Sequence, residues 1–229
     1  MQAAALITRA NDILQDLTEV RWTLAEKLRW LSDMQRTIVL YLPEAHNING
    51  AIPLVGGATK QTLPPAALQL IRLTCNLGAD GLTPGRAIRL VDREILDAQV
   101  PTWHTDAAGT EIKHYVFDKL DPKTFYVYPR PASALQVGAV YSTAPAELTA
   151  PTDTLALDDS YAGPLLDGLL YRCYSKDAEY AKNPALAATY YQAFVAALGI
   201  RSNVASADDP NANSTFNPAV APGAAAVPR

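Results

Sequence analysis

The chain is poor in the residue types from which most metal and thiol sites are built. Its 229 residues include two cysteines, Cys75 and Cys173, and three histidines, His46, His104 and His114. No CxxC or Cys/His ligand spacing surrounds the cysteines, and the nearest two histidines are ten residues apart. We therefore expect two buried, reduced thiols, no bound metal and no cofactor.

Catalytic motifs are missing as well. The sequence has no G-x-S-x-G, no P-loop and no G-x-G-x-x-G. The adjacent Asp158 and Asp159 precede a predicted helix, where acidic side chains favour the helix dipole. No catalytic residue is assigned. An enzyme with a cleft between helices and a β-rich part stays open as another class, but it would need convergent titratable groups.

Positive charge is scarce and scattered. Nineteen Lys and Arg stand against 23 Asp and Glu, for a formal net charge of -4, and no run of basic residues occurs. A protein that grips phosphates needs such a run or patch, which disfavours a nucleic-acid binder. A channel wall along which DNA slides, by contrast, functions better without strong basic charge.

Long apolar stretches are also absent. No apolar run reaches the roughly 18 residues that a membrane-spanning helix needs. The first residues, MQAAALITRANDIL, lack the basic segment and apolar core of an export signal. We therefore expect a protein that stays in the cytosol and does not associate with a membrane.

The sequence does contain enough apolar residues for a packed core, at 49% apolar and 18% charged. From Leu6 to Leu17, apolar residues recur at steps of three and four, which predicts a helix over residues 3–17. Thr23 and Glu26 form a capping box that begins a second helix. Pro43 ends this second helix.

The middle of the chain has a β-strand pattern. Short segments between 47 and 140 alternate apolar and polar residues and are separated by Gly and Pro. Four residues are expected to share one strand face: Ile71, Leu73, Cys75 and Leu77. Residues 112–117 and 125–128 are expected to form a hairpin, and Asp92 to cap a short helix over 93–98.

The helical period returns after Pro151. It predicts a third helix over residues 159–181, and Asn183 with Pro184 begins a fourth that ends at Gly199. Residues 200–229 are dominated by Ala, Asn, Pro and Ser. A segment with so little to bury is expected to be extended or disordered alone and to order against a partner.

Together these elements predict an α+β fold that is mainly α. It is a four-helix bundle with a β-rich insertion between helices two and three and an extended C-terminal tail. The bundle is assigned to residues 1–46 and 151–199, the insertion to 47–150 and the tail to 200–229.

Five side chains are the candidates for contacts with partner proteins: Trp103, His104, Tyr126, Tyr128 and Phe216. The first two lie in a predicted loop, the two tyrosines share one face of a predicted strand, and the last is the only aromatic residue of the tail. The tyrosines could also stack on nucleic-acid bases, but only Lys123 and Arg130 are near them. Half-buried strand or subunit-contact positions are the preferred interpretation.

Several segments resemble a family of bacteriophage virion proteins that are encoded near portal and tail genes, the head-to-tail adaptors. The resemblance rests on order and spacing up to Gly199. It is carried by RWTLAE at 21–26, LRWL at 28–31, QR at 35–36, IV at 38–39, GRAIR at 85–89, DP at 121–122, FYVYP at 125–129, YSTAP at 141–145, SKDAEY at 175–180 and YYQAF at 190–194.

The resemblance implies a structural, non-enzymatic role in the neck of the virion, with assembly in the host cytoplasm. It implies a ring of usually twelve copies that binds the portal and the tail or nozzle proteins. The helices would line the channel and dock on the portal, the β insertion would face tail components, and DNA would pass through without specific binding. A tail-tube or other virion connector protein is the alternative within this class.

Overall fold

The computed structural model describes residues 1–118, 120–176 and 184–207. The chain divides into two compact units, Met1–Tyr161 and Ala162–Arg229. Among the described residues, the first unit contains three α-helices and all of the β-strands, and the second contains two further α-helices.

The first helix, α1 (Ala3–Leu14), ends earlier than its apolar stripe predicted. Gln15 adopts the left-handed conformation at a φ of 53°, and its N–H donates to the carbonyl of Asn11. This residue closes the helix, so Leu17 lies in the following loop with 72% of its surface exposed. The apolar stripe indicated which residues share a face and did not reveal the left-handed residue that ends the helix.

The second helix, α2 (Leu24–Tyr41), begins at the predicted capping box. The Thr23 hydroxyl accepts from the Glu26 N–H, and the Glu26 carboxylate accepts from the Thr23 N–H at 3.1 Å. The helix gives way to a 3-10 turn, η1 (Pro43–Ala45), that starts at the predicted proline. The predicted start and end of this helix are therefore confirmed.

The β-structure forms two four-stranded sheets. The strands of the first, in spatial order, are β1 (Asn47–Pro53), β8 (Gln136–Thr143), β3 (Ala67–Leu77) and β4 (Pro84–Ala87). The strands of the second are β2 (Lys60–Thr62), β7 (Thr124–Tyr128), β6 (His114–Phe117) and β5 (Arg89–Leu90). All pairs are antiparallel except the parallel pair β5 and β6. The predicted hairpin is confirmed as β6 and β7.

The predicted face of β3 is wrong. Its pairing with β8 shifts register between Leu70 and Arg72 and again between Leu73 and Asn76, so the regular alternation is lost. Leu73 is buried, but Ile71 is 36% exposed and the buried position after Leu73 is Asn76. Each irregularity moves the following side chains to the other face.

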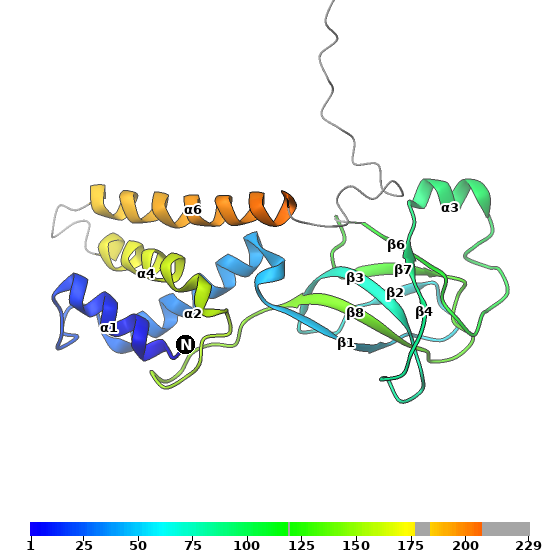
Figure 1. The fold of residues 1–229 in the computed structure, drawn as a ribbon, viewed down its shortest axis with the longest axis horizontal. Helices are drawn as coiled ribbons and strands as arrows, with labels where there is room; N and C mark the ends of the chain where they lie inside the picture. The colour runs from blue at the N-terminus through cyan, green and yellow to red at the C-terminus, as the bar shows by residue number, and fades with distance from the viewer. Residues whose placement is uncertain (119, 177–183, 208–229) are drawn as a thin grey trace, which may run out of the picture. The chain divides into compact units, whose positions relative to one another are not determined.

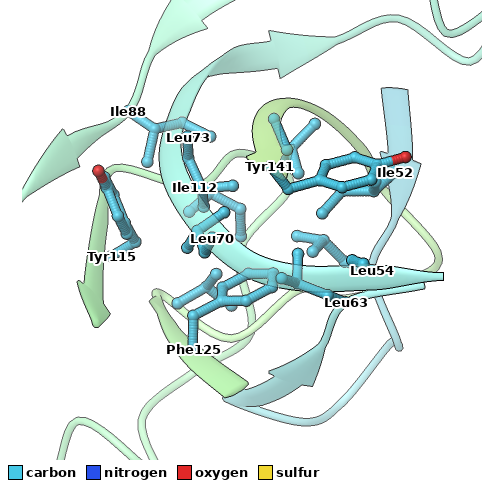
Figure 2. Packing of buried hydrophobic residues seen from close by; sticks show 14 residues of the cluster. Ile52, Leu54, Leu63, Leu70, Leu73, Ile88, Ile112, Tyr115, Phe125 and Tyr141 are labelled. Atoms are coloured by element: carbon cyan, nitrogen blue, oxygen red, sulfur yellow. The ribbon is translucent and has the colours of Figure 1, made fainter. Parts of the chain in front are cut away.

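The two sheets share one apolar core (Figure 2). Leu70 and Leu73 from β3 and Ile52 from β1 meet Phe125 and Tyr115 from the second sheet. Phe125 is completely buried. Since both sheets contribute to the same cluster, they form one rigid β-body that holds the turns at its edges in place.

The short helix α3 (Arg93–Gln99) lies between β5 and β6 in the sequence, and its prediction is confirmed. The Asp92 carboxylate accepts from the Glu94 N–H at 3.0 Å, as expected for an N-cap. Leu96 is the buried residue of this helix. It belongs to a small apolar cluster with Trp103 and Val116.

The second unit consists of α4 (Ala162–Lys176) and α6 (Pro184–Ala207), which lie side by side (Figure 1). Tyr171 and Tyr191 have ring centroids 5.0 Å apart, and Tyr174 stacks on Tyr190 at 5.6 Å. The fourth helix starts at Pro184 as predicted but continues past Gly199, so residues 200–207 are helical and not an extended tail. The predicted tail beyond Ala207 lies outside the described residues.

The predicted four-helix bundle is wrong. The described residues contain five α-helices and two four-stranded sheets. The first and last helix pairs belong to different compact units, and the β-structure has a core of its own. Helical periodicity predicts which residues a helix buries, but it does not tell which element covers them.

Candidate interaction surfaces

Trp103 is the centre of a layer of side chains beneath α3. It is 1% exposed, and its indole Nε1 donates to Asp97 Oδ1 at 2.7 Å. This hydrogen bond satisfies the only polar atom of the ring and ties the loop after α3 to the helix. The predicted contact residue Trp103 therefore positions its neighbours and does not itself reach the surface.

Two side chains, His104 and Tyr126, pack against this indole, and Arg93 lies over the Tyr126 ring; together they complete what we call the Trp103 cluster. His104 stacks on Trp103 with ring centroids 3.7 Å apart, and its Nδ1 lies 2.9 Å from the Thr59 hydroxyl. Tyr126 meets Trp103 edge-on at 6.1 Å, and Arg93 Cζ lies 5.5 Å from the Tyr126 ring centre. His104 and Arg93 are exposed, and Arg93 Nε also lies 3.5 Å from Asp97 Oδ2, so the cluster presents a polar and aromatic surface.

Tyr128 lies next to this cluster on the same strand face as Tyr126. Its ring stacks on His114 at 6.4 Å, and its hydroxyl donates to Asp106 Oδ2 at 3.4 Å. Partial burial, followed by the Asp106 charge and hydrogen bond, raises the pKa of Tyr128. Burial and then the charges of nearby basic residues, Arg89 first, lower the pKa of His114. The structure thus brings four predicted contact residues together, while Phe216 lies outside the described residues.

The β3–β4 turn, residues 78–83, presents an exposed leucine on a rigid loop. The Asp80 carboxylate accepts from the N–H groups of Leu82 and Thr83, each at 3.0 Å, and from the Thr83 hydroxyl at 2.6 Å. These bonds, with the Thr83 hydroxyl first, lower the pKa of Asp80 to about 2. Leu82 is 82% exposed although the backbone that carries it is held at several points.

Two glycines make this turn possible. Gly81 has a φ of 68°, which favours glycine, and a Cβ there would lie 3.4 Å from the Cβ of Ala51 in β1. A Cβ on Gly78 would lie 2.8 Å from Asp80 Oδ1, so a substitution there would displace the carboxylate that holds the turn. The turn is closed by a bond from the Gly78 N–H to the Thr83 carbonyl at 2.8 Å.

The α1–α2 loop is a second rigid loop that exposes apolar side chains, Leu17 at 72% and Val20 at 80%. Its centre is Asp16, whose carboxylate accepts from three successive N–H groups, those of Val20, Arg21 and Trp22, at 3.0–3.1 Å. These bonds, with Trp22 first, lower the pKa of Asp16. The charged carboxylate therefore supports the loop above its ordinary pKa, and the support is lost as the pH falls below the lowered value.

A buried ammonium group underlies the same loop. Lys27 is completely buried, and its Nζ donates to Asn11 Oδ1 and lies 3.3 Å from Glu19 Oε1. Glu19 itself has a φ of 55°, a conformation that non-glycine residues seldom adopt. The shape of the α1–α2 loop thus depends on the buried charge of Lys27 and on two residues in the left-handed conformation, Gln15 and Glu19.

Two surface pockets lie next to each other in the first unit and share Glu44. One, of about 540 Å³, is polar and includes three acids: Glu44, Asp158 and Asp159. The other, of about 340 Å³, is mainly apolar and is lined by Pro43, Glu44, Gln69, Leu70, Ile71 and Phe117. We call this second pocket the Ile71 pocket. Within the described residues no group of three His, Cys, Asp or Glu side chains could hold a metal ion.

Leu82, Leu17 and the Ile71 pocket were missed by the sequence interpretation. The pair Asp80 and Gly81 is a turn signal, so the β3–β4 turn could have been found. The exposure of Leu82 could not have been predicted, because the sequence pattern does not distinguish an exposed leucine from a core leucine.

No helix in the described part of the chain is long and apolar enough to cross a membrane. In comparisons with known proteins, the model of the family described as SU10 adaptor protein matches residues 1–219. A comparison with curated proteins found no match.

Proposed function

Because the chain belongs to the SU10 adaptor protein family, and is therefore a structural component of a bacteriophage virion, we propose that it forms a ring that joins the portal to the tail. The ring lines the channel through which DNA leaves the head, and twelve copies is the number that the adaptor resemblance implies. The observation that carries this proposal is the family match over nearly the whole chain.

The described surfaces support an assembly role. Leu17, Val20 and Leu82 are each more than two thirds exposed, on loops that hydrogen bonds to a single aspartate hold in shape. Contact of such apolar side chains with water is unfavourable, and burial against a partner removes this unfavourable free energy. Because the loops are already ordered, little conformational entropy is lost on binding. A ring of identical subunits supplies that cover through one repeated contact.

The Trp103 cluster is the surface that we assign to a tail or nozzle protein. Tyrosine, tryptophan and arginine are enriched where protein interfaces bury most of their energy. His104 and Arg93 are exposed; the buried Trp103 ring stacks on His104, and Tyr126 lies beneath Arg93. Tyr128 extends the same surface. The β-body would then face the tail.

The test of the ring is native mass spectrometry with negative-stain imaging, on the purified protein alone and after mixing with purified portal. We expect closed rings of uniform copy number that cap the portal. Stacked rings or open tubes would favour a tail-tube protein instead. A protein that stays monomeric both alone and with portal would contradict the proposal.

We expect only weak binding to DNA. The net charge of -4 and the scattered basic residues give no track for phosphates. A gel shift at physiological salt with micromolar protein is expected to show no complex, beside a basic DNA-binding protein as the positive control. Tight binding that salt weakens would exclude a passive channel.

A further inference from the structure

The Leu82 side chain and the Ile71 pocket match in chemistry, because both are mainly apolar. Leu82 is 82% exposed, and the Asp80 carboxylate fixes the backbone N–H groups of Leu82 and Thr83 at 3.0 Å. The Ile71 pocket has a volume of about 340 Å³, the space of roughly ten liquid waters, and Pro43, Leu70, Ile71 and Phe117 supply its apolar lining. A branched aliphatic side chain suits such a pocket.

A subunit cannot fill its own pocket with its own Leu82. The pocket is built on the start of β3 at residues 69–71, and the turn follows the end of the strand at Leu77. Six residue steps separate Ile71 from Leu77, roughly 20 Å along a strand. Because one strand in a shared core carries both features, their relative position is fixed.

Charges of opposite sign flank the two features. Arg86, on the exposed strand β4, and Arg89, on β5, follow the turn. Glu44 lines the pocket and also lines the neighbouring acidic pocket with Asp158 and Asp159. Asp80 lies in the turn itself and the exposed Arg72 follows Ile71, so each feature carries charges of both signs. Bringing the turn of one copy to the pocket of another lets Arg86 and Arg89 pair with Glu44 and its acidic neighbours, and Asp80 with Arg72, which steers association and sets its register.

We propose that Leu82 of each subunit inserts into the Ile71 pocket of the next subunit, so that the occupant of the pocket is a second copy of this chain. The contact is heterologous, since different surfaces meet, and a repeated heterologous contact closes into a ring when its rotation fits. This inference rests on the proposed ring and specifies which residues form its seam.

The first test compares Leu82→Ser with Leu120→Ser as the matched control. Leu120 is 93% exposed on the β6–β7 turn, so both changes remove an exposed leucine from a turn. Mass photometry over a concentration series is expected to show subunit association weakened roughly 10- to 100-fold by Leu82→Ser and unchanged by the control. Ile71→Glu is expected to weaken association similarly, and equal melting curves would show that the variants fold.

The second test asks whether the contact joins two different surfaces. In a Cys75→Ser background, one protein carries Leu82→Cys and the other Ile71→Cys; Cys173 stays because it is buried. Oxidation of the mixture is expected to give a disulfide-linked dimer that neither protein gives alone. The chain with both changes is expected to give a ladder of linked oligomers, because each subunit then has both partners.

The possible results of these two tests distinguish failure of the proposed seam from failure of the proposed ring. If the unmodified protein forms rings and Leu82→Ser forms them equally well, the contact between subunits lies elsewhere. The same follows if the unmodified protein forms rings and no mixed disulfide appears. In both cases the proposed ring is retained and the proposed seam is wrong. If Leu82→Ser assembles normally but loses portal binding, the portal is the occupant and our assignment is wrong. If the unmodified protein forms no ring alone or with portal, the proposed function fails together with the seam.

Discussion

Replacing Asn76 with leucine is expected to lower the free energy of unfolding by about 4 kcal/mol. Asn76 is 7% exposed, and its side chain makes three hydrogen bonds to backbone groups. Nδ2 donates to the carbonyls of Arg86 at 2.9 Å and Ile112 at 2.7 Å, and Oδ1 accepts from the Ile112 N–H at 2.8 Å. Leucine leaves the buried N–H and carbonyl of Ile112 and the partly buried carbonyl of Arg86 without this partner, at roughly 1–3 kcal/mol for each buried group and less where water reaches.

Urea denaturation of the Asn76→Leu variant is the measurement, with Asn49→Leu on the exposed part of β1 as the control. The control is expected to change stability by less than about 0.5 kcal/mol. Asn76→Asp keeps the acceptor for Ile112 N–H and loses both donors, so it is expected to be destabilised too. A loss below about 1 kcal/mol for Asn76→Leu would mean that water replaces the missing bonds.

The Asn76→Leu change is expected to weaken subunit assembly as well as stability. Asn76 joins the end of β3 to β4, the two strands whose connecting turn carries Leu82. A variant that still folds at low temperature is therefore expected to assemble poorly, because the hairpin is no longer held against the segment before β6.

Lys27→Ala is expected to lower the free energy of unfolding by about 3 kcal/mol. The change removes a completely buried ammonium group, leaves the Asn11 amide oxygen without its donor, and leaves the Glu19 carboxylate with the Asn11 Nδ2 group, at 3.1 Å, but without its cation. Because Glu19 is 26% exposed, water compensates part of its loss, and we place the effect at the lower end for a broken buried pair.

Arg29→Ala, at an exposed position of the same helix, is the control and is expected to cost less than about 0.5 kcal/mol. Lys27→Met keeps the apolar stem, so it separates lost packing from lost charge. If both Lys27 variants unfold at the same denaturant concentration as the unmodified protein, the buried ammonium contributes little and the α1–α2 loop is held by Asp16 alone.

Local signals in the sequence were sufficient for several elements. The Thr23 capping box, the Asp92 cap and the hairpin of β6 and β7 all depend on side chains within a few residues of one another. Such short-range chemistry can be read from a single sequence. Such local signals are not always sufficient. Gly199 was expected to end the last helix, but α6 continues through it to Ala207.

Structural features that depend on residues far away in the sequence could not be predicted from the sequence. The shifts along β3 arise from its pairing with β8, more than sixty residues later in places, so the exposure of Ile71 was not predictable. Likewise, Trp103, His104 and the two tyrosines were chosen as aromatic residues of a loop and a strand. Their assembly around one indole requires α3 to supply Asp97 and Arg93.

The pairing of β1 with β8 has a consequence for how such proteins diversify. Asn47 is paired with Ser142, so the chain enters and leaves the β-body at neighbouring positions, roughly 5 Å apart at the Cα atoms. A segment with adjacent ends can be exchanged by recombination without stretching the helices on either side. Residues 47–143, which include α3, thus form a segment with adjacent ends, and exchanging it changes the surface of the β-body without changing the helices before and after it in the sequence.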